Sequence, residues 1–293
     1  MCKTGVVLAC CLAVPTLAIA NDDWRMTSDV QAQYGSYSKS VLRDNISSVG
    51  AIVAADYLDQ AGVTVASSST RVKFKTLPTI NQQSWFLSGR YHLFFDALPG
   101  VLTLRLDGHA INNNDTTGNT DGVRVIAPQL SFTNFDKTWY VDIGYARSTY
   151  KNNLTLNQYT PTVGMGFNEQ ADWLQVRGYI IDVSNPLRAQ NKKSTAAAEV
   201  KWSHWFAPGN VLALHQMQVG LLAGERVFAV DGDAAAVYNL ADIQRGSATL
   251  SLTWKTSDNS HIMLLGGQER YLDNTIGNSY TSRFGYVDAS VQW

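Results

Sequence analysis

The sequence predicts an all-β fold, an antiparallel up-and-down β-barrel of about fourteen strands, within a range of about twelve to sixteen. Three observations lead to this prediction. Apolar and polar residues alternate along about fourteen segments, the connections between them alternate between short and long, and aromatic residues gather near the segment ends. Successive side chains of a strand point to opposite faces, so each segment would present one apolar and one polar face. No long stretch has a helical period.

The first seven segments show the alternation clearly. In the fifth, Leu102, Leu104 and Leu106 alternate with polar residues such as Arg105 and Asp107. In the fourth, Trp85, Leu87 and Tyr91 share one face. The expected strands are 24–34, 46–57, 62–73, 80–95, 102–110, 122–132 and 139–146.

The second seven segments continue the pattern over 154–167, 173–183, 196–203, 211–223, 245–254, 261–271 and 280–293. Pro128 and Pro161 fit badly, because they fall inside the sixth and eighth segments. Proline cannot donate a hydrogen bond to a neighbouring strand, and a closed barrel has no free edge. Each proline therefore predicts either a bulge or a different strand boundary.

The connections also alternate along the chain. After even-numbered segments they are tight, as in 59–61, 134–136 and 256–259. After odd-numbered segments most are longer and polar, as in 112–121, 184–194 and 224–242. Short turns at one end and long loops at the other are typical of bacterial outer-membrane barrels, whose short turns lie in the periplasm.

The aromatic residues predict two girdles, as expected for rings that anchor a barrel at the two interfaces of a membrane. One girdle, at the short-turn end, contains Trp24, Trp139, Trp173, Trp202, Trp205, Trp254, Trp293, Phe95, Phe132, Phe167 and Phe206. The other, at the long-loop end, contains Tyr37, Tyr150, Tyr271 and Tyr280.

The last segment is the most informative one, although its signal of eight residues is weakly specific by itself. Val287, Ala289, Val291 and Trp293 alternate with Tyr286, Asp288, Ser290 and Gln292, and the sequence ends on the aromatic residue. This segment resembles the C-terminal strand by which the barrel-assembly machinery recognises Gram-negative outer-membrane proteins. Over residues 21–293 the chain resembles small monomeric porins and diffusion channels, in architecture and terminal signal and without a family-specific motif.

Residues 1–20 have the features of a secretory signal peptide. Lys3 precedes an apolar stretch, and Ala18-Ile19-Ala20 is a small-residue cleavage site. We therefore expect export through the periplasm after cleavage near Ala20, and a barrel domain over 21–293 in the cell outer membrane. A lipoprotein signal at Cys10 is a weaker alternative. All three cysteines precede residue 21, so we expect neither disulfides nor thiolate chemistry afterwards.

The charge balance argues against nucleic acid as a partner. Without Lys3 the chain has 22 basic and 24 acidic residues, and no basic motif contradicts the balance. The expected partners are instead outer-membrane lipid, the assembly machinery and small hydrophilic solutes. We expect no cofactor and no metal site.

Charged residues of both signs fall on the expected inner faces. A barrel of about fourteen strands is too wide to fill with short side chains alone, since about eight strands already give a packed interior. Such residues can set ion selectivity, or they can pair and brace the wall. The pore-lining candidates are Arg90, Arg105, Asp107, Asp142, Arg177, Glu199, Lys201 and Arg245.

The longest connection, 224–242, has two interpretations. It could fold inward as a gate or plug, but loops vary freely in length, so the sequence favours an exposed surface loop. Its Asp231-Gly232-Asp233 is only a weak calcium signal.

Three functional classes are compatible with such a barrel. Some outer-membrane barrels are lipid-modifying enzymes, but only His109 lies near the long-loop end, and no Ser-His-acid group can be assembled around it. The sequence therefore predicts no enzyme and no catalytic residue. The resemblance implies a passive diffusion pore, and the alternative is a non-conducting barrel that binds a partner or has a structural role.

Overall fold

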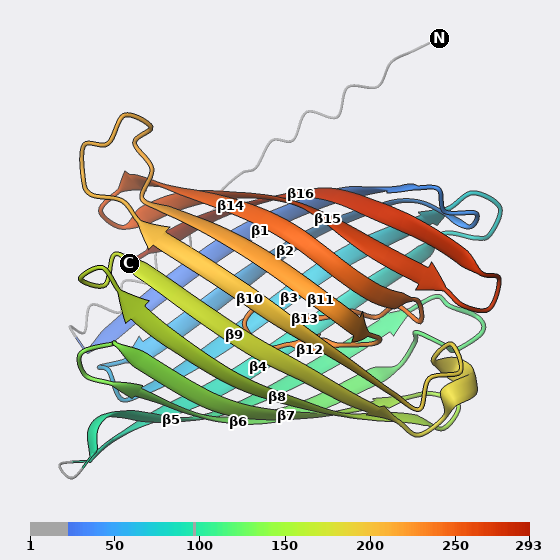
Figure 1. Ribbon diagram of the computed structural model, residues 1–293, viewed down its shortest axis with the longest axis horizontal. Helices are drawn as coiled ribbons and strands as arrows, with labels where there is room; N and C mark the ends of the chain where they lie inside the picture. Colours follow the sequence, from blue (N-terminus) through green and yellow to red (C-terminus); the bar gives the residue numbers. More distant parts are fainter. Residues whose placement is uncertain (1–22, 96–97) are drawn as a thin grey trace.

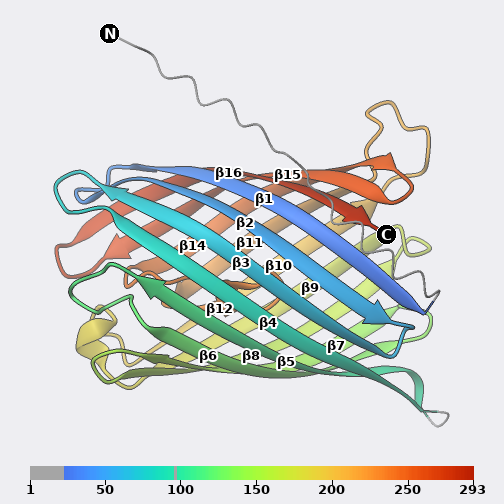
Figure 2. The ribbon, with the colours of Figure 1, turned by 180° about the vertical axis from the view of Figure 1, so that it is seen from behind.

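The structure, a computed structural model, describes residues 23–95 and 98–293, which form a closed antiparallel barrel of fourteen strands. Neighbours in the wall are neighbours in sequence, and the strands are tilted relative to the long axis (Figures 1 and 2). The wall strands are β1 (Trp24–Ser38), β2 (Arg43–Tyr57), β3 (Ala61–Phe74), β4 (Ile80–Phe95), β5 (Leu98–Asn113), β6 (Val123–Asn134), β7 (Trp139–Tyr150), β8 (Leu154–Phe167), β9 (Asp172–Val183), β10 (Ser194–Trp205), β11 (Gln216–Arg226), β14 (Ile243–Ser257), β15 (Ser260–Asp273) and β16 (Asn278–Gln292).

The first and last strands close the barrel. β1 pairs with β16 from Thr27–Gln292 to Ser38–Thr281. Beyond that register, the backbones of Met26 and Trp293 exchange two hydrogen bonds of 2.9 Å. The last strand therefore has its predicted place and alternation, with Val287 and Val291 exposed.

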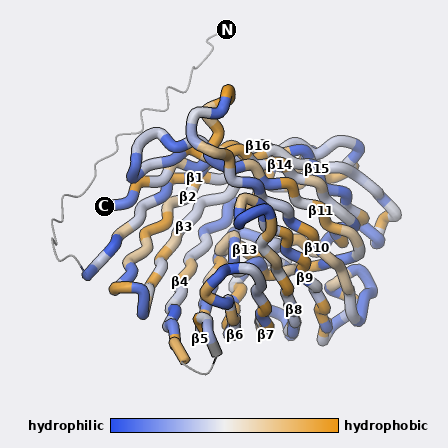
Figure 3. The backbone as a smooth tube through the Cα atoms, turned by 60° about the vertical axis from the view of Figure 1, so that its left-hand side comes forward, coloured by the Kyte–Doolittle hydropathy of each residue, from blue (hydrophilic) through white to orange (hydrophobic). Residues whose placement is uncertain are grey.

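Hydrophobic and hydrophilic residues alternate along the wall strands, as the change of colour in Figure 3 shows. On the outer face, large apolar side chains are exposed on almost every strand, including Val53, Leu87, Leu106, Ile143 and Leu264. Exposure of so much apolar surface is unfavourable in water, while a closed barrel satisfies its backbone groups in lipid. The outer face therefore places the barrel in a membrane.

Over residues 23–95 and 98–293, no helix combines the length and the apolar character needed to cross a membrane. The expected signal peptide, residues 1–20, lies outside the described residues.

Pro128 and Pro161 lie inside β6 and β8 without a bulge and without a strand boundary, so both expectations for them are wrong. The β6–β7 register is the same before and after Pro128, from Ile126–Arg147 to Gln129–Gly144. The β8–β9 register is likewise preserved across Pro161. Each proline stays paired on its other side, so the wall tolerates a local gap in one ladder.

One connection at the short-turn end is longer than predicted. β11 begins at Gln216, not at residue 211, so residues 206–215 form a ten-residue loop. Val211 and Leu212 in this loop are exposed. The alternation of apolar residues extended the predicted strand into the loop.

The aromatic girdle is confirmed only in part at the short-turn end and is wrong at the other. Trp173 has the parity of the inward Arg177 in β9, so it lies on the inner face, with its ring 6.4 Å from that of Tyr140. Trp24, Trp139 and Trp205 are exposed at the strand ends beside the short turns. Tyr37, Tyr150, Tyr271 and Tyr280 are all buried in the interior. The alternation explains this, because each tyrosine is an even number of residues from inward-facing neighbours in its strand.

Candidate functional site

The interior of the barrel is occupied by residues 227–242, the connection between β11 and β14. This segment carries a two-stranded hairpin, β12 (Val230–Asp231) and β13 (Ala236–Val237), whose labels lie within the outline of the barrel in Figure 1. Residues 227–231 are all buried. The expectation of an exposed surface loop is therefore wrong, and we call residues 227–242 the lumen loop.

The first limb of the lumen loop packs on the inner wall of β5 to β9. Val227, Phe228 and Ala229 are at most 2% exposed and belong to one apolar cluster with wall residues. The ring of Phe228 lies 4.9 Å from that of Tyr150. The wall residues of the cluster are Ile111, Val123, Val125, Ala146, Tyr150, Leu154, Leu156, Ile181 and Val183. This inward apolar surface, unusual for a water-filled lumen, is what the loop covers.

A glutamine of the wall holds the backbone of the hairpin. The Gln158 side chain donates to the Val230 carbonyl (2.6 Å) and accepts from the Val230 amide (2.9 Å). Both residues are buried, so both backbone groups would otherwise lack a partner in an apolar surrounding. Gln158 therefore fixes the hairpin against β8.

The hairpin tip, Asp231-Gly232-Asp233, lies between two arginines of the wall. Arg177 of β9 lies 2.7 Å from Asp233 and 3.6 Å from Asp231. Arg105 of β5 donates to the Gly232 carbonyl (2.7 Å) and lies 3.9 Å from Asp233. A Cβ on Gly232 would lie 3.0 Å from Asp107, so a glycine suits this close approach.

The wall arginines also have partners of their own. Arg105 donates to Asp107 (2.8 Å), and Arg177 donates to Thr162 (3.1 Å) and lies 4.0 Å from Asp142. Of these side chains, those of Arg177, Asp107 and Asp142 are nearly fully buried, while that of Asp233 remains 43% exposed. The Asp233 carboxylate at the tip thus remains accessible to solvent.

Further basic groups surround the tip from β10 and β11. Lys201 lies 3.4 Å from Glu199, which accepts a hydrogen bond from Tyr179. Burial disfavours the charged form of Asp231, yet the positive charges of Lys201, Arg177 and Arg226 hold the pKa of this carboxyl below its usual range. Asp231 is therefore held as a carboxylate.

Arg226 fixes the start of the lumen loop by cation–π contacts. Its guanidinium lies 4.2 Å from the ring centroid of Tyr238 and 5.0 Å from that of Tyr179. Its Nη1 has no hydrogen-bond partner in the described residues. A polar cavity of about 10 Å³ beside it, lined also by Asp242 and Gln244, is at the lower limit for one water molecule.

The second limb of the lumen loop crosses to the opposite wall. Asn239 donates to Gln82 of β4 (2.8 Å) and to the Thr120 carbonyl (2.6 Å). Leu240 packs on the buried tyrosines Tyr37, Tyr271 and Tyr280, and Asp242 pairs with Arg43 of β2 at 2.9 Å. The loop therefore contacts the wall on both sides of the barrel.

The entry to the lumen loop depends on an irregular β11. The β11–β14 register shifts between Ala223 and Arg226, and Gly224 there has φ +108°. A Cβ on Gly224 would lie 2.5 Å from the Ala196 carbonyl oxygen. Only glycine fits this backbone, which turns the chain from the wall toward the interior.

The remaining candidates lie away from the tip. Arg90 of β4 pairs with Asp56 of β2, in a separate inward-facing ion pair. Arg245 does not share the inner face, because the β14–β15 register shifts between Gln244 and Gly246. Gln244 is buried there, while the Arg245 side chain is 53% exposed and lies 3.6 Å from Glu225.

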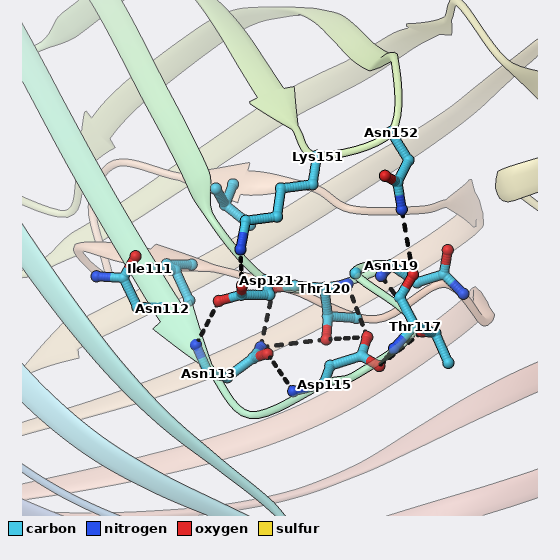
Figure 4. A network of polar contacts seen from close by, with 12 residues as sticks. Ile111, Asn112, Asn113, Asp115, Thr117, Asn119, Thr120, Asp121, Lys151 and Asn152 are labelled. Atoms are coloured by element: carbon cyan, nitrogen blue, oxygen red, sulfur yellow. Dashed lines mark hydrogen bonds and ion pairs between the residues drawn. The ribbon is translucent and has the colours of Figure 1, made fainter.

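The long loops form a second polar network above the barrel, shown in part in Figure 4. Asp121 pairs with Lys151 and accepts from the Asn113 amide. Partial burial opposes the charge of Asp115, but donors from Thr117 and Thr120 hold the pKa of this carboxyl below its usual range. The loops at this end are therefore ordered by their own hydrogen bonds.

Arg188 joins three of these loops. It lies in the 3₁₀ turn η1 (Pro186–Arg188) and donates to backbone carbonyls of Gly118, Asn119, Lys151 and Asn152. Gln190 extends the connection to residues 274–275. The loops between β5 and β6, β7 and β8, and β9 and β10 thus form one cap.

Several sequence candidates come together and some do not. Arg105, Asp107, Asp142, Arg177, Glu199 and Lys201 all lie around the hairpin tip or its neighbours, whereas Arg90 and Arg245 do not. Sequence reasoning missed Gln158, Arg226 and the role of Asp231 and Asp233.

His109, the histidine that the sequence places near the long-loop end, is buried beside Phe86, with ring centroids 4.8 Å apart. Within the described residues, no cluster of three metal-binding side chains occurs.

Comparison with known proteins identifies the fold. Neither a protein-family model nor a curated protein sequence matches the chain. The CymD monoaromatic hydrocarbon channel is similar with a TM-score of 0.56 and 10% identity, over 92% of this chain and 88% of the other. The TodX deltaS2S3 mutant, also a monoaromatic hydrocarbon channel, has a TM-score of 0.53 and 11% identity, over 94% and 92%. The chain has the closed β-barrel fold of these channels.

Proposed function

We propose that the protein is a passive diffusion channel of the outer membrane for small hydrophilic solutes or ions, and that the lumen loop controls passage. The observation that carries this proposal is the pairing of Arg105 and Arg177 of the wall with the tip of the lumen loop, which bears Asp231 and Asp233. The charged inner face supports a hydrophilic permeant, since ionisable groups at membrane depth favour water or each other.

The lumen loop changes the sign of the charge around its tip. The surrounding wall provides four basic groups, Arg105, Arg177, Lys201 and Arg226, against three acidic groups, Asp107, Asp142 and Glu199. Asp231 and Asp233 make the set acidic by one charge. A passage with the tip in place would therefore favour cations, and one without these carboxylates would favour anions.

The CymD and TodX structures are channels for monoaromatic hydrocarbons, and that substrate class suits this chain poorly. Asp233 is 43% exposed and Lys201 21% exposed at the tip, where a permeant would pass. Charged groups in contact with a permeant favour polar solutes, because an apolar molecule would displace their water without replacing its hydrogen bonds.

A non-conducting barrel is the second candidate, and the packing of the lumen loop favours it. The first limb has an apolar core with side chains at most 2% exposed, and the second limb is tied to β2, β4 and β16. Such a loop could be a permanent plug rather than a gate. The barrel would then act through its long-loop cap, as a scaffold for a partner.

Single-channel recording decides between these candidates. The refolded protein is inserted into a planar bilayer, with heat-modifiable gel mobility as the check on folding. We expect discrete ohmic steps whose ion selectivity shifts toward anions in Asp233→Asn. Silence of the folded wild-type protein at all voltages would contradict the channel and support the plugged scaffold.

The barrel-assembly machinery is the proposed partner of the last strand. One face of the last strand carries the apolar side chains of Val287, Ala289, Val291 and Trp293, as the resemblance requires. Tyr286 lies on the other face, where its hydroxyl donates a hydrogen bond to the Gln31 side-chain oxygen (2.6 Å). If this strand is the assembly signal, Trp293→Ala should lower the folded fraction in cells while the purified variant still refolds in detergent. Equal loss in both settings would mean that Trp293 matters for stability alone.

A further inference from the structure

Three arginines lie together on the outer face of the barrel, near its long-loop end. Arg270 is exposed on the face of β15 that also carries Leu264, and Arg283 is exposed on the face of β16 that carries Val287. Arg245 belongs to the neighbouring strand β14 and is also exposed. The three side chains thus come from consecutive strands on the side of the wall that faces lipid.

The strand register brings the three arginines close to one another. Arg270 pairs with Thr281, so Arg283, two residues further along β16, is its diagonal neighbour at about 7–8 Å. Arg270 also pairs with Gly246, and the bulge between Gln244 and Gly246 puts Arg245 beside that pair. The bulge that removes Arg245 from the inner face therefore adds it to this group.

Few carboxylates neutralise this group. Arg245 shares Glu225 with Lys192, which lies 2.7 Å from the same carboxylate. Among the described residues, no carboxylate oxygen lies within 4.0 Å of the Arg270 or Arg283 guanidinium; Arg283 donates instead to the Gln268 amide oxygen (3.1 Å). The group therefore has a net positive charge at the edge of the apolar belt.

Below the arginines, toward the middle of the wall, the outer face lacks side chains at two paired positions. Gly266 of β15 pairs directly with Gly285 of β16. A Cβ on Gly285 would meet no atom within 4 Å, and one on Gly266 would meet only a backbone oxygen at 3.9 Å. Exposed apolar residues border the pair, with Tyr34 on β1 and Leu250 on β14.

We propose that this surface, Arg245, Arg270 and Arg283 above Gly266 and Gly285, binds a phosphate-bearing membrane lipid. Guanidinium groups bind phosphate through paired, charge-assisted hydrogen bonds, and the glycine pair gives an acyl chain close contact with the backbone. The order of the two features, charge at the rim and bare apolar wall below it, matches a lipid oriented in the leaflet at the long-loop end. The proposal depends on the membrane location of the barrel and is independent of conduction.

The test uses the full-length folded protein in dodecyl maltoside, with lipid A, a bis-phosphorylated and acylated glucosamine disaccharide, as the probe. Bound lipid is measured by native mass spectrometry over a titration. Arginines near an anionic membrane surface contribute about fivefold each in affinity, so Arg270→Gln with Arg283→Gln should weaken binding about 25-fold. Gly285→Leu, which places a side chain where the acyl chain would lie, should also weaken binding, whereas excess inorganic phosphate should leave the lipid bound.

Matched controls separate a specific site from general attraction. Arg25→Gln removes an exposed arginine at the opposite rim, and Gly89→Leu adds a leucine at another outer position with no atom within 4 Å of the added Cβ. Both controls should bind as the wild type does. Equal losses in Arg25→Gln, unchanged binding in the double arginine variant, or displacement by phosphate alone would overturn the proposal. A barrel that binds lipid but does not conduct would contradict only the proposed channel.

Discussion

Replacement of Phe228 by alanine should release the lumen loop from the wall while the barrel itself stays intact. Phe228 is 2% exposed, packs on Tyr150, and belongs to the loop rather than to a wall strand. A buried Phe→Ala change costs about 3–5 kcal/mol, which includes the cavity that it leaves. Because the loop loses these contacts only on undocking, its opening equilibrium should rise by at least about 150-fold, at about 1.4 kcal/mol per factor of ten.

Hydrogen exchange measures this change directly. The Val230 and Tyr238 amides are hydrogen-bonded only while the hairpin is formed and docked, so their exchange reports loop opening. In Phe228→Ala their protection should fall by about two orders of magnitude, while amides of the wall ladders keep theirs. Phe135→Ala, in an exposed turn at the other end, serves as the control. Unchanged protection in Phe228→Ala would refute the idea that the apolar cluster holds the loop in the lumen.

Three further predictions concern charge, acidity and backbone. In bilayer recordings, Arg105→Gln should move the reversal potential toward cation selectivity, because Asp107 and Asp233 then lose a positive neighbour; an unchanged potential would remove Arg105 from the conduction path. The lumen loop should be released in acid: the pKa of Asp231 is lowered in the folded protein, so its contribution is complete above the usual aspartate range of about 4 and is lost as the pH falls through the lower folded value. Conductance should accordingly be constant from about pH 5 to 7 and change only below about pH 4, and Asp231→Asn should abolish that change. Gly224→Ala should cost about 1–3 kcal/mol through strain at φ +108°, and it should lower the temperature at which heat-modifiable mobility is lost, whereas Gly277→Ala, at a position with positive φ in an open turn, should have less effect.

The alternation of the sequence determines which face of the wall a residue occupies. It placed Arg105, Asp107 and Arg177 inward correctly, since a strand has period two and the barrel has only two faces. The four tyrosines at the long-loop end obey the same rule, and they were misassigned because their level along the strand was considered without their parity. Arg245 was misassigned for another reason, because a bulge shifts the parity by one residue and leaves no mark in the alternation.

The alternation of apolar and polar residues could not locate the lumen loop, because residues 227–242 follow no regular alternation. Its apolar start, Val227 to Val230, does carry a signal: four consecutive apolar residues would be unfavourable in an exposed loop. The matching signal is on the wall, where Leu154, Leu156 and Ile181 are apolar on the inward face. Neither of these two apolar segments identifies the other as its partner, since the contact joins residues more than 45 positions apart in the sequence.

The charges of the wall explain why the loop matters to the interior. The backbones of Arg105 on β5 and Arg177 on β9 are separated by four strand spacings, about 19 Å along the wall at about 4.8 Å each, yet both guanidinium groups lie within 4.0 Å of Asp233. The hairpin tip lies between them, with the Gly232 carbonyl 2.7 Å from Arg105 and Asp233 2.7 Å from Arg177. The tip thus joins two arginines that come from distant strands of the wall. Its removal would therefore leave two arginines short of partners at membrane depth, so an open state requires water in the lumen to solvate them. The contacts that hold the loop in the lumen thus make its undocked form depend on a hydrated, hydrophilic interior.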